Sequence, residues 1–151
     1  MHSNFKQQLI EISACKESIV WVGDRTFEQA YNDCHRGDWL LWLHAKTADL
    51  TIYANHRLLT LAKAKCANTV RHLMKNKRST KAVDVAIAYG EGRATREELA
   101  AAAAAAAAYA AADAYPAYAY AAAYARKENQ KLTADIVRKT ITIDKFNFYA
   151  Q

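Results

Sequence analysis

The sequence predicts an all-α, mainly helical fold, and two observations support this. The chain of 151 residues contains only four glycines and one proline, whereas a sandwich or barrel of strands needs many turns. Residues 100–108 are all alanine, the residue that forms helices best because it loses no side-chain entropy. We expect one domain spanning residues 1–151, with six to seven helices around a central Ala/Tyr-rich helix and short terminal strands.

The N-terminal part is expected to form one short strand and three helices. FKQQLIEI (residues 5–12) partly alternates between apolar and polar residues, which is typical of a strand. A helix over residues 13–22 follows, capped by Ser13. Thr26 and Gln29 have the spacing of a capping box, which opens a helix over residues 27–34. Gly37 ends that helix, and Asp38 caps the next one, over residues 39–46.

The middle of the chain is expected to form one long helix and one shorter helix. The long helix runs from Asp49 to about Lys75, because a buried stripe recurs at about 100° per residue. The stripe consists of Ile52, Leu59, Cys66, Val70 and Leu73. Ser79 or Thr80 caps the shorter helix, which ends at Gly90 and Gly92.

The alanine-rich helix begins at a second capping box, formed by Thr95 and Glu98. Larger neighbours can approach an all-alanine face closely, so we expect this helix to be central and packed on more than one side. Pro116 lacks an N–H and is expected to kink or break the helix near Ala112. A last helix over residues 131–140 leads into ITIDKFNFY (residues 141–149), whose alternation is typical of a closing strand.

Composition excludes several classes of protein from this interpretation. No run of eighteen large apolar residues exists, so we expect no membrane span. The five histidines and three cysteines show no paired ligand spacing, so we expect no metal and no cofactor. The sequence holds no nucleophile elbow and no phosphate-binding glycine loop, so we expect no catalytic residues. The unpaired cysteines suit a reducing compartment, which favours a cytoplasmic protein.

The basic residues favour an anionic partner. The formal net charge is +6, and residues 63–81 carry seven basic residues and no acidic residue. Arg57, Ala64 and Arg71 recur every seven residues on the long helix, where guanidiniums could clamp a phosphate-bearing ligand. Tyrosine rings of the alanine-rich helix could stack on a base. The candidate ligand-binding residues are Tyr53, Arg57, Arg71, Lys75, Tyr109, Tyr120 and Tyr124.

Each of these features also has a structural interpretation. The basic residues could form a solvated helix face or pair with Asp84, Glu97 and Asp113, and the tyrosines could pack at the ends of a bundle.

A second anion site is expected at the start of the helix capped by Ser79 or Thr80, beside Lys77, Arg78 and Lys81. In RGDWLLWL (residues 36–43), the two tryptophans are adjacent on a helix. For them, core packing is the default interpretation.

Four strings together resemble a known family. They are ACKESIVWVGDRTFEQAYNDCHRGDWLLWL, RLLTLAKAKCANTVRHL, AVDVAIAYGEGRATREELAAA and TADIVRKTI. The set is similar to the immunity-five-like branch of the bacterial immunity proteins, a branch common in phage genomes, over roughly residues 13–141. The resemblance implies an essentially all-α fold without catalytic activity, and it carries over no functional residue.

Two function hypotheses follow. The first is a non-enzymatic phage or mobile-element counter-defence protein that sequesters an anionic, nucleotide-like small molecule in the host bacterial cytoplasm. The second is a protein-blocking immunity or anti-defence factor that binds an acidic protein partner. Nucleic-acid binding is a third, less favoured hypothesis, and a homodimer through an exposed alanine face stays open.

Overall fold

The chain folds into an all-α structure, as the sequence predicts. A computed structural model describes residues 4–110 and 119–148, and their side chains except those of 107–110 and 119–126. In this part of the chain the structure contains eight α-helices, two 3₁₀ turns and no β-strand. The helices are α1 (Phe5–Glu11), α2 (Lys16–Val22), α3 (Phe27–Asp33), α4 (Gly37–Thr47), α5 (Tyr53–Asn68), α6 (Lys77–Gly90), α7 (Arg96–Ala110) and α8 (Ala119–Thr140).

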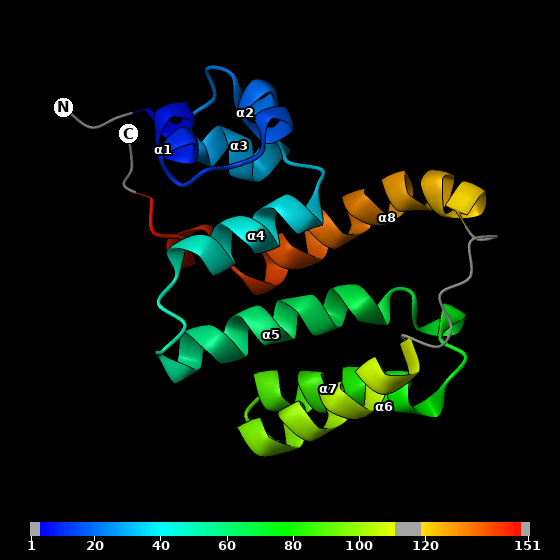
Figure 1. Cartoon of the computed structure of the whole chain (residues 1–151). Coiled ribbons are helices and arrows are strands. Elements are labelled where there is room, and N and C mark those ends of the chain that lie inside the picture. The colour runs from blue at the N-terminus through cyan, green and yellow to red at the C-terminus, as the bar shows by residue number, and fades with distance from the viewer. Residues whose placement is uncertain (1–3, 111–118, 149–151) are drawn as a thin grey trace.

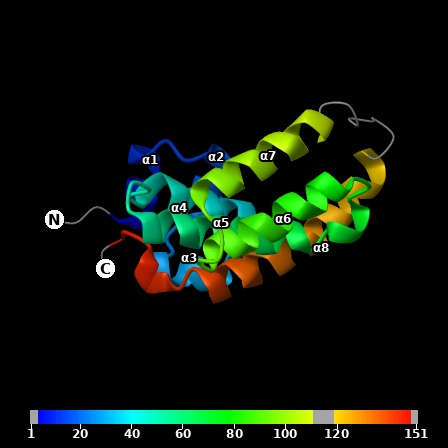
Figure 2. The ribbon, with the colours of Figure 1, turned by 90° about the horizontal axis from the view of Figure 1, so that it is seen from below.

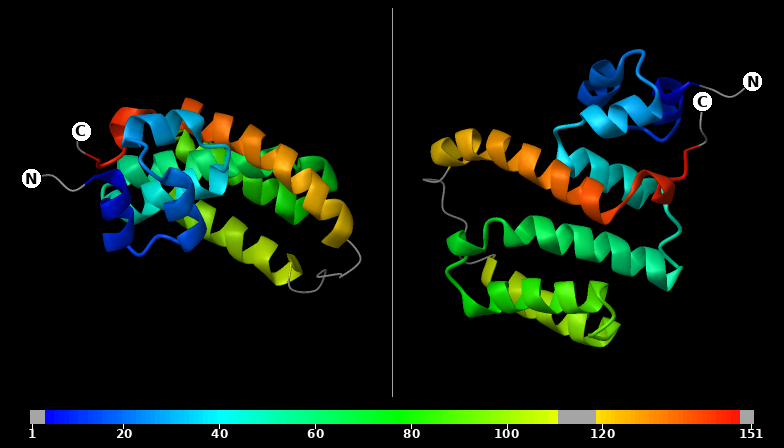
Figure 3. Two further views of the ribbon diagram at one scale, coloured as in Figure 1. Left: turned by 90° about the horizontal axis from the view of Figure 1, so that it is seen from above. Right: turned by 180° about the vertical axis from the view of Figure 1, so that it is seen from behind.

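The helices lie in successive layers (Figure 1). The short helices α1, α2 and α3 form one outer layer, and α4 and α8 lie beneath it. Helix α5 follows, and α6 and α7 form the opposite outer layer, an order that is also visible from behind (Figure 3). Seen from below, α6 and α7 lie side by side over α5 (Figure 2). Both described ends of the chain meet beside α1, where Phe5 and Phe148 have ring centroids 5.1 Å apart.

The core lies where the short helices meet α4 and α8. Ala134 and Val137 of α8 are fully buried there, and so is Ile141, which directly follows α8. Phe27 packs against Phe146 with ring centroids 5.6 Å apart. Since α1, α2 and α3 have seven residues each, they are too short to persist alone and depend on this packing.

Both predicted strands are wrong. Residues 5–11 form α1, with the Asn4 side chain accepting a hydrogen bond from the Gln7 amide at 2.8 Å. Phe5 and Leu9 are both buried. Residues at i and i+4 lie on one face of a helix and also on one face of a strand, so their spacing does not distinguish the two structures. At the C-terminal end, Ile143–Lys145 forms a 3₁₀ turn instead of a strand.

The two capping boxes are confirmed, while three other predicted caps are wrong. Thr26 and Gln29 exchange both hydrogen bonds, as do Thr95 and Glu98, at 3.1 and 3.2 Å. The N-cap residues of α2, α4 and α6 are Cys15, Arg36 and Asn76. Ser13, Asp38 and Ser79 or Thr80 were the predicted caps.

Helix α5 is shorter than predicted, and α7 is not central. α5 ends at Asn68 because the amides of Thr69 and Val70 turn back to the carbonyls of Cys66 and Ala67 in 3₁₀ geometry. Leu73 therefore lies outside the predicted stripe and is 66% exposed. α7 packs on α6 at the edge of the molecule (Figure 2), and its described alanines are exposed or half-buried. Pro116 and the predicted break near Ala112 lie outside the described residues.

Two glycines allow neighbouring helices to approach closely. A Cβ atom on Gly37 of α4 would lie 2.5 Å from Thr133 Oγ1 of α8, and one on Gly90 of α6 would lie 2.5 Å from Leu61 Cβ of α5. Real Cβ atoms do not approach other atoms this closely. Gly37 and Gly90 therefore set the spacing between α4 and α8 and between α5 and α6.

Candidate functional site

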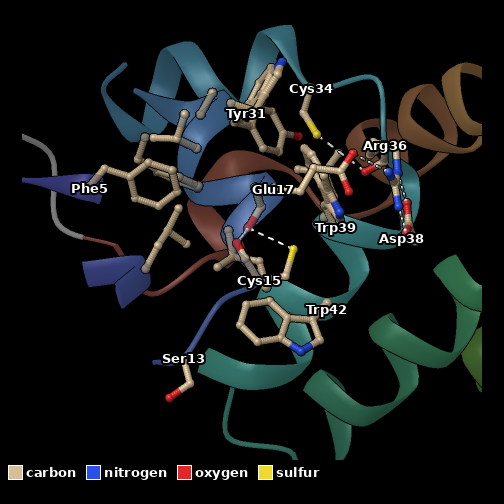
Figure 4. Close-up of a pocket in the computed structure, with 18 residues that line it drawn as sticks. Phe5, Ser13, Cys15, Glu17, Tyr31, Cys34, Arg36, Asp38, Trp39 and Trp42 are labelled. Carbon is tan, nitrogen blue, oxygen red and sulfur yellow. Dashed lines mark hydrogen bonds and ion pairs between the residues drawn. The ribbon is translucent and has the colours of Figure 1, made fainter. Parts of the chain in front are cut away.

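A cavity of about 590 Å³ lies among the four N-terminal helices (Figure 4). Its inner part is lined by buried apolar side chains of α1 to α4, including Phe5, Phe27 and Leu43. Its outer part carries the polar groups and the tryptophans. These outer residues are Ser13, Cys15, Glu17, Ser18, Trp21, Arg36, Asp38, Trp39 and Trp42.

The helical period explains why these side chains converge. In α3, Phe27, Ala30 and Tyr31 recur at i, i+3 and i+4, and all three line the cavity. In α4, Trp39, Trp42 and Leu43 recur with the same spacing. Helices α3 and α4 thus each present one continuous face to the same space.

Trp21 and Trp39 form an aromatic wall of the cavity, and an arginine side chain stacks on each of the two rings. The rings of Trp21 and Trp39 have centroids 6.0 Å apart with an angle of 58° between their planes. The Arg25 guanidinium lies 4.5 Å from the Trp21 ring centroid, and the Arg36 guanidinium lies 4.6 Å from that of Trp39. These cation–π contacts hold the two rings in place. Trp42 remains 40% exposed.

The charged groups at the mouth of the cavity form one connected set. Arg36 donates to Asp38 from Nε at 2.8 Å and from Nη2 at 2.6 Å, and its Nη1 lies 3.7 Å from Glu17 Oε1. The hydrogen bond from Arg36 lowers the pKa of the Asp38 carboxyl below its ordinary value. One guanidinium thus serves two carboxylates, and the set Glu17–Arg36–Asp38 is net negative. It does not present a free cation to an anionic ligand.

Two thiols line the same cavity in different surroundings. Cys15 is exposed, and its hydrogen bond with the Ser18 hydroxyl, with sulfur and oxygen 3.3 Å apart, lowers the pKa of the thiol. Cys34 is buried, and burial raises the pKa of its thiol. The Tyr31 hydroxyl is 3.0 Å from the carbonyl oxygens of Arg138 and Ile141. These two hydrogen bonds of Tyr31 position α3 against the C-terminal end of α8.

The expected ligand-binding residues whose side chains the structure describes do not line this cavity; they are Tyr53, Arg57, Arg71 and Lys75. Arg57 donates from Nη1 to the Tyr89 carbonyl at 3.1 Å, and its guanidinium lies 4.7 and 5.0 Å from the ring centroids of Tyr53 and Tyr89. Tyr89 is fully buried, and its hydroxyl oxygen is 2.6 Å from His56 Nδ1. Arg57 therefore braces α5 against the C-terminal end of α6, a role that the sequence pattern did not indicate.

Arg71 lies apart from Arg57. It belongs to the 3₁₀ turn Arg71–Leu73 beyond the end of α5 and forms a bidentate ion pair with Asp84 of α6, at 2.5 and 2.9 Å. Lys75 is exposed in the connection to α6. The side chains of Tyr109, Tyr120 and Tyr124 lie outside the described residues. The structure thus brings together Tyr53 with Arg57, but not Arg57 with Arg71.

The sequence did contain a signal for the cavity. All three tryptophans lie within the first 42 residues, and arginine precedes Trp39 by three positions and follows Trp21 by four. The interpretation of Trp39 and Trp42 as core residues considers only their own helix, on which they are neighbours. The sequence pattern does not record that α2 and α3 face these two side chains across a cavity.

Comparison with known proteins adds no relative, because no family model, curated protein or solved structure matches the chain. The resemblance to the immunity-five-like proteins therefore stays an expectation drawn from the four strings. Within residues 4–110 and 119–148, His, Cys, Asp and Glu form no group of three or more that could hold a metal ion. None of the described helices combines the length and hydropathy needed to cross a bilayer.

Proposed function

We propose that the chain is a non-enzymatic binding protein that binds a flat, largely apolar small molecule in the cavity formed by α1 to α4. The observation that carries this proposal is the 590 Å³ cavity with tryptophans at its mouth. Small-molecule sites in proteins measure about 300–1,000 Å³ and have mostly apolar and aromatic walls with few polar groups. Tight, slowly dissociating binding would suffice for sequestration.

The charges at the mouth narrow the class of ligand. A phosphate group would have to displace Asp38 and Glu17 from Arg36, since these two carboxylates hold the guanidinium. A neutral or cationic ligand meets no such cost, and the exposed carboxylates can accept its hydrogen bonds. We therefore expect the preferred ligand to carry donors rather than acid groups at the end nearest to Arg36.

A matched pair of fluorescent probes tests both parts of the proposal. N-phenyl-1-naphthylamine is neutral, and 1-anilinonaphthalene-8-sulfonate is its anionic counterpart. We expect saturable binding with one site, energy transfer from the tryptophans, and clearly tighter binding of the neutral probe. Asp38→Asn should shift this preference toward the anionic probe, because Arg36 then has one carboxylate fewer.

Two variants locate the probe. Ala30→Phe fills the cavity from its buried wall and should abolish binding of the neutral probe, whereas Leu132→Ala removes an exposed apolar side chain of α8 and should leave binding unchanged. Circular dichroism checks that each variant is folded. Equal binding by wild type and a folded Ala30→Phe variant would show that the probe sits elsewhere.

The nucleotide-like ligand expected from the sequence is a second candidate, and one observation favours it. Arg36 stacks on Trp39, so a base could stack beside the same ring while a phosphate recruits Arg36 from Asp38. A counter-defence role for such sequestration rests on the family resemblance. Preference for the anionic probe in the wild-type protein would favour this candidate.

The protein-blocking alternative also has one supporting observation. Ile10, Val20 and Trp42 are exposed at 47%, 69% and 40% on α1, α2 and α4, the helices that build the cavity. Native mass spectrometry of the protein from producing cells, before and after denaturation, separates the two functions. A released small mass supports a small-molecule ligand, and an intact complex with a second protein supports blocking.

A further inference from the structure

The cavity formed by α1 to α4 contains a nucleophile that the proposed function does not use. Cys15, the N-cap residue of α2, is one of the residues that line the cavity, and it is also exposed (Figure 4). A molecule that fills the cavity therefore meets a sulfur atom that is open to water.

The surroundings of Cys15 favour its thiolate form. Its sulfur is 3.3 Å from Ser18 Oγ, and the Ser18 hydroxyl is 2.8 Å from the Cys15 carbonyl oxygen. Once the thiol has lost its proton, this hydroxyl can turn and donate to the sulfur. Hydrogen bonding to Ser18 is the main cause of the lowered pKa of the thiol; Arg36 also lowers this pKa, while partial burial and Glu17 oppose the change. The net result is a larger thiolate fraction, and the thiolate is the nucleophilic form.

The second thiol of the cavity lacks this reactivity. Cys34 is buried, and its sulfur is 3.5 Å from the carbonyl oxygen of Arg36. Burial raises the pKa of the Cys34 thiol, and a protonated thiol is a poor nucleophile. Of the two cysteines that line the cavity, only Cys15 combines access with thiolate character.

The cavity itself indicates which electrophiles can reach Cys15. Its volume of about 590 Å³ and its apolar inner wall suit a small molecule, whatever the thiol does. Its mouth carries the net negative set Glu17–Arg36–Asp38, which disfavours an anionic compound. An electrophile that binds here is therefore neutral, flat and largely apolar.

A conjugated carbonyl compound combines these properties with reactivity toward a thiolate. It is neutral, and addition to its double bond expels no leaving group. We propose that the cavity binds flat, apolar α,β-unsaturated carbonyl compounds and that Cys15 attaches them covalently. This inference rests on the proposed function, because it uses the same cavity.

The reaction is a simple addition. The Cys15 thiol gives its proton to water, and a sulfur lone pair forms the bond to the β-carbon of the ligand. The π electrons of the C=C bond move to the carbonyl oxygen, and water then protonates the α-carbon of the resulting enolate. The net change is addition of S–H across the double bond, without oxidation or reduction. Ser18 is a positioning residue that holds the sulfur.

Two naphthalene probes separate binding from reaction. Acrylodan carries a vinyl ketone, whereas prodan, its propionyl counterpart, cannot react. Intact-mass spectrometry and peptide mapping should find one acrylodan per chain, on Cys15. The rate should level off as the acrylodan concentration rises, and prodan should slow it by competition. Relative to methyl vinyl ketone, which has no rings, acrylodan should be favoured at least about tenfold more by the protein than by glutathione, because binding holds the reacting atoms together.

Matched variants locate the reaction. Cys15→Ser should form no adduct, whereas Cys66→Ser should react like the wild type, since Cys66 is not among the residues that line the cavity. Ser18→Ala should move the profile of rate against pH to higher pH, an effect that a purely structural role of Ser18 would not produce. Ala30→Phe fills the cavity and should abolish the levelling off of the rate. Circular dichroism checks that each variant is folded.

The possible failures are distinguishable. Saturable binding of prodan without an acrylodan adduct on Cys15 overturns this inference and leaves the proposed function intact. A rate that rises linearly with acrylodan concentration, with the same preference between the two ketones as glutathione shows, means an ordinary exposed thiol and also overturns the inference. Absence of saturable prodan binding overturns the proposed function and this inference together.

Discussion

Arg138 of α8 holds α3 in place, and its replacement by methionine should destabilise the whole chain. The guanidinium donates from Nη1 to the carbonyls of Tyr31, at 3.2 Å, and Cys34, and from Nη2 to Asp135 Oδ1 at 2.6 Å. The carbonyls in the last turn of a helix have no partner within the helix, and a cation near them is favoured by the helix dipole. Arg138 therefore caps α3, the helix that supplies Phe27, Ala30 and Tyr31 to the cavity wall.

The size of the effect follows from the bonds that are lost. Methionine keeps an apolar stem for packing but leaves the two carbonyls of α3 without their charged donor. A hydrogen bond to a charged group contributes about 1.5–3 kcal/mol. Because the side chain is 20% exposed, water can replace part of this interaction. We therefore expect Arg138→Met to lower the free energy of unfolding by about 2–4 kcal/mol.

Urea unfolding followed by tryptophan fluorescence measures this difference. Asp135→Asn is the matched control, because it removes only the surface pair with a carboxylate that is 60% exposed. That change should reduce the free energy of unfolding by less than about 1 kcal/mol. If Arg138→Met and Asp135→Asn had equal effects, the capping of α3 by Arg138 would contribute nothing, and the reasoning would be refuted.

Three further predictions concern packing, pH and thiol reactivity. Gly37→Ala should lower the free energy of unfolding by about 1–3 kcal/mol and lower Tm, because its Cβ would overlap Thr133; an unchanged Tm would contradict this close contact. His44 is 1% exposed with no hydrogen-bond partner for Nδ1, and burial lowers its pKa below the ordinary 6.5. The unfolded chain thus binds a proton at His44 more readily than the folded chain does. The contribution of His44 to the free energy of unfolding is therefore fully present above pH 6.5 and decreases below it by up to about 1.4 kcal/mol per pH unit. In urea unfolding, His44→Leu should remove that decrease, and the control His72→Gln should not. In the native protein a thiol reagent at mildly alkaline pH should modify Cys15 quickly and Cys34 and Cys66 only on unfolding, since burial raises the pKa of Cys66 to about 11; fast reaction of more than one native thiol contradicts this.

Local sequence signals gave the fold class and much of the helix order. Scarce glycine and proline and the alanine run predict helices, and the boxes at Thr26 and Thr95 open helices as expected, because their hydrogen bonds join residues only three positions apart. The terminal strands failed for a related reason. Over seven residues, the apolar pattern at Phe5 and Leu9 fits a helix and a strand equally well, and packing decides between them.

The candidate site depended on contacts that no local pattern records. The seven-residue repeat predicts the same role for Arg57 and Arg71. In the structure, Arg57 donates to the carbonyl of Tyr89, 32 residues away, whereas Arg71 pairs with Asp84, 13 residues away. Trp21 and Trp39 line one cavity only because α2 and α4 face each other across it.

The sequence by itself determined that the chain is helical and basic, since helix propensity and charge belong to the residues themselves. The tertiary structure alone decided which arginines are paired and where a cavity opens. Those properties depend on side chains brought together from distant elements, and the close approach at Gly37 and Gly90 and the capping of α3 by Arg138 fix how these elements meet.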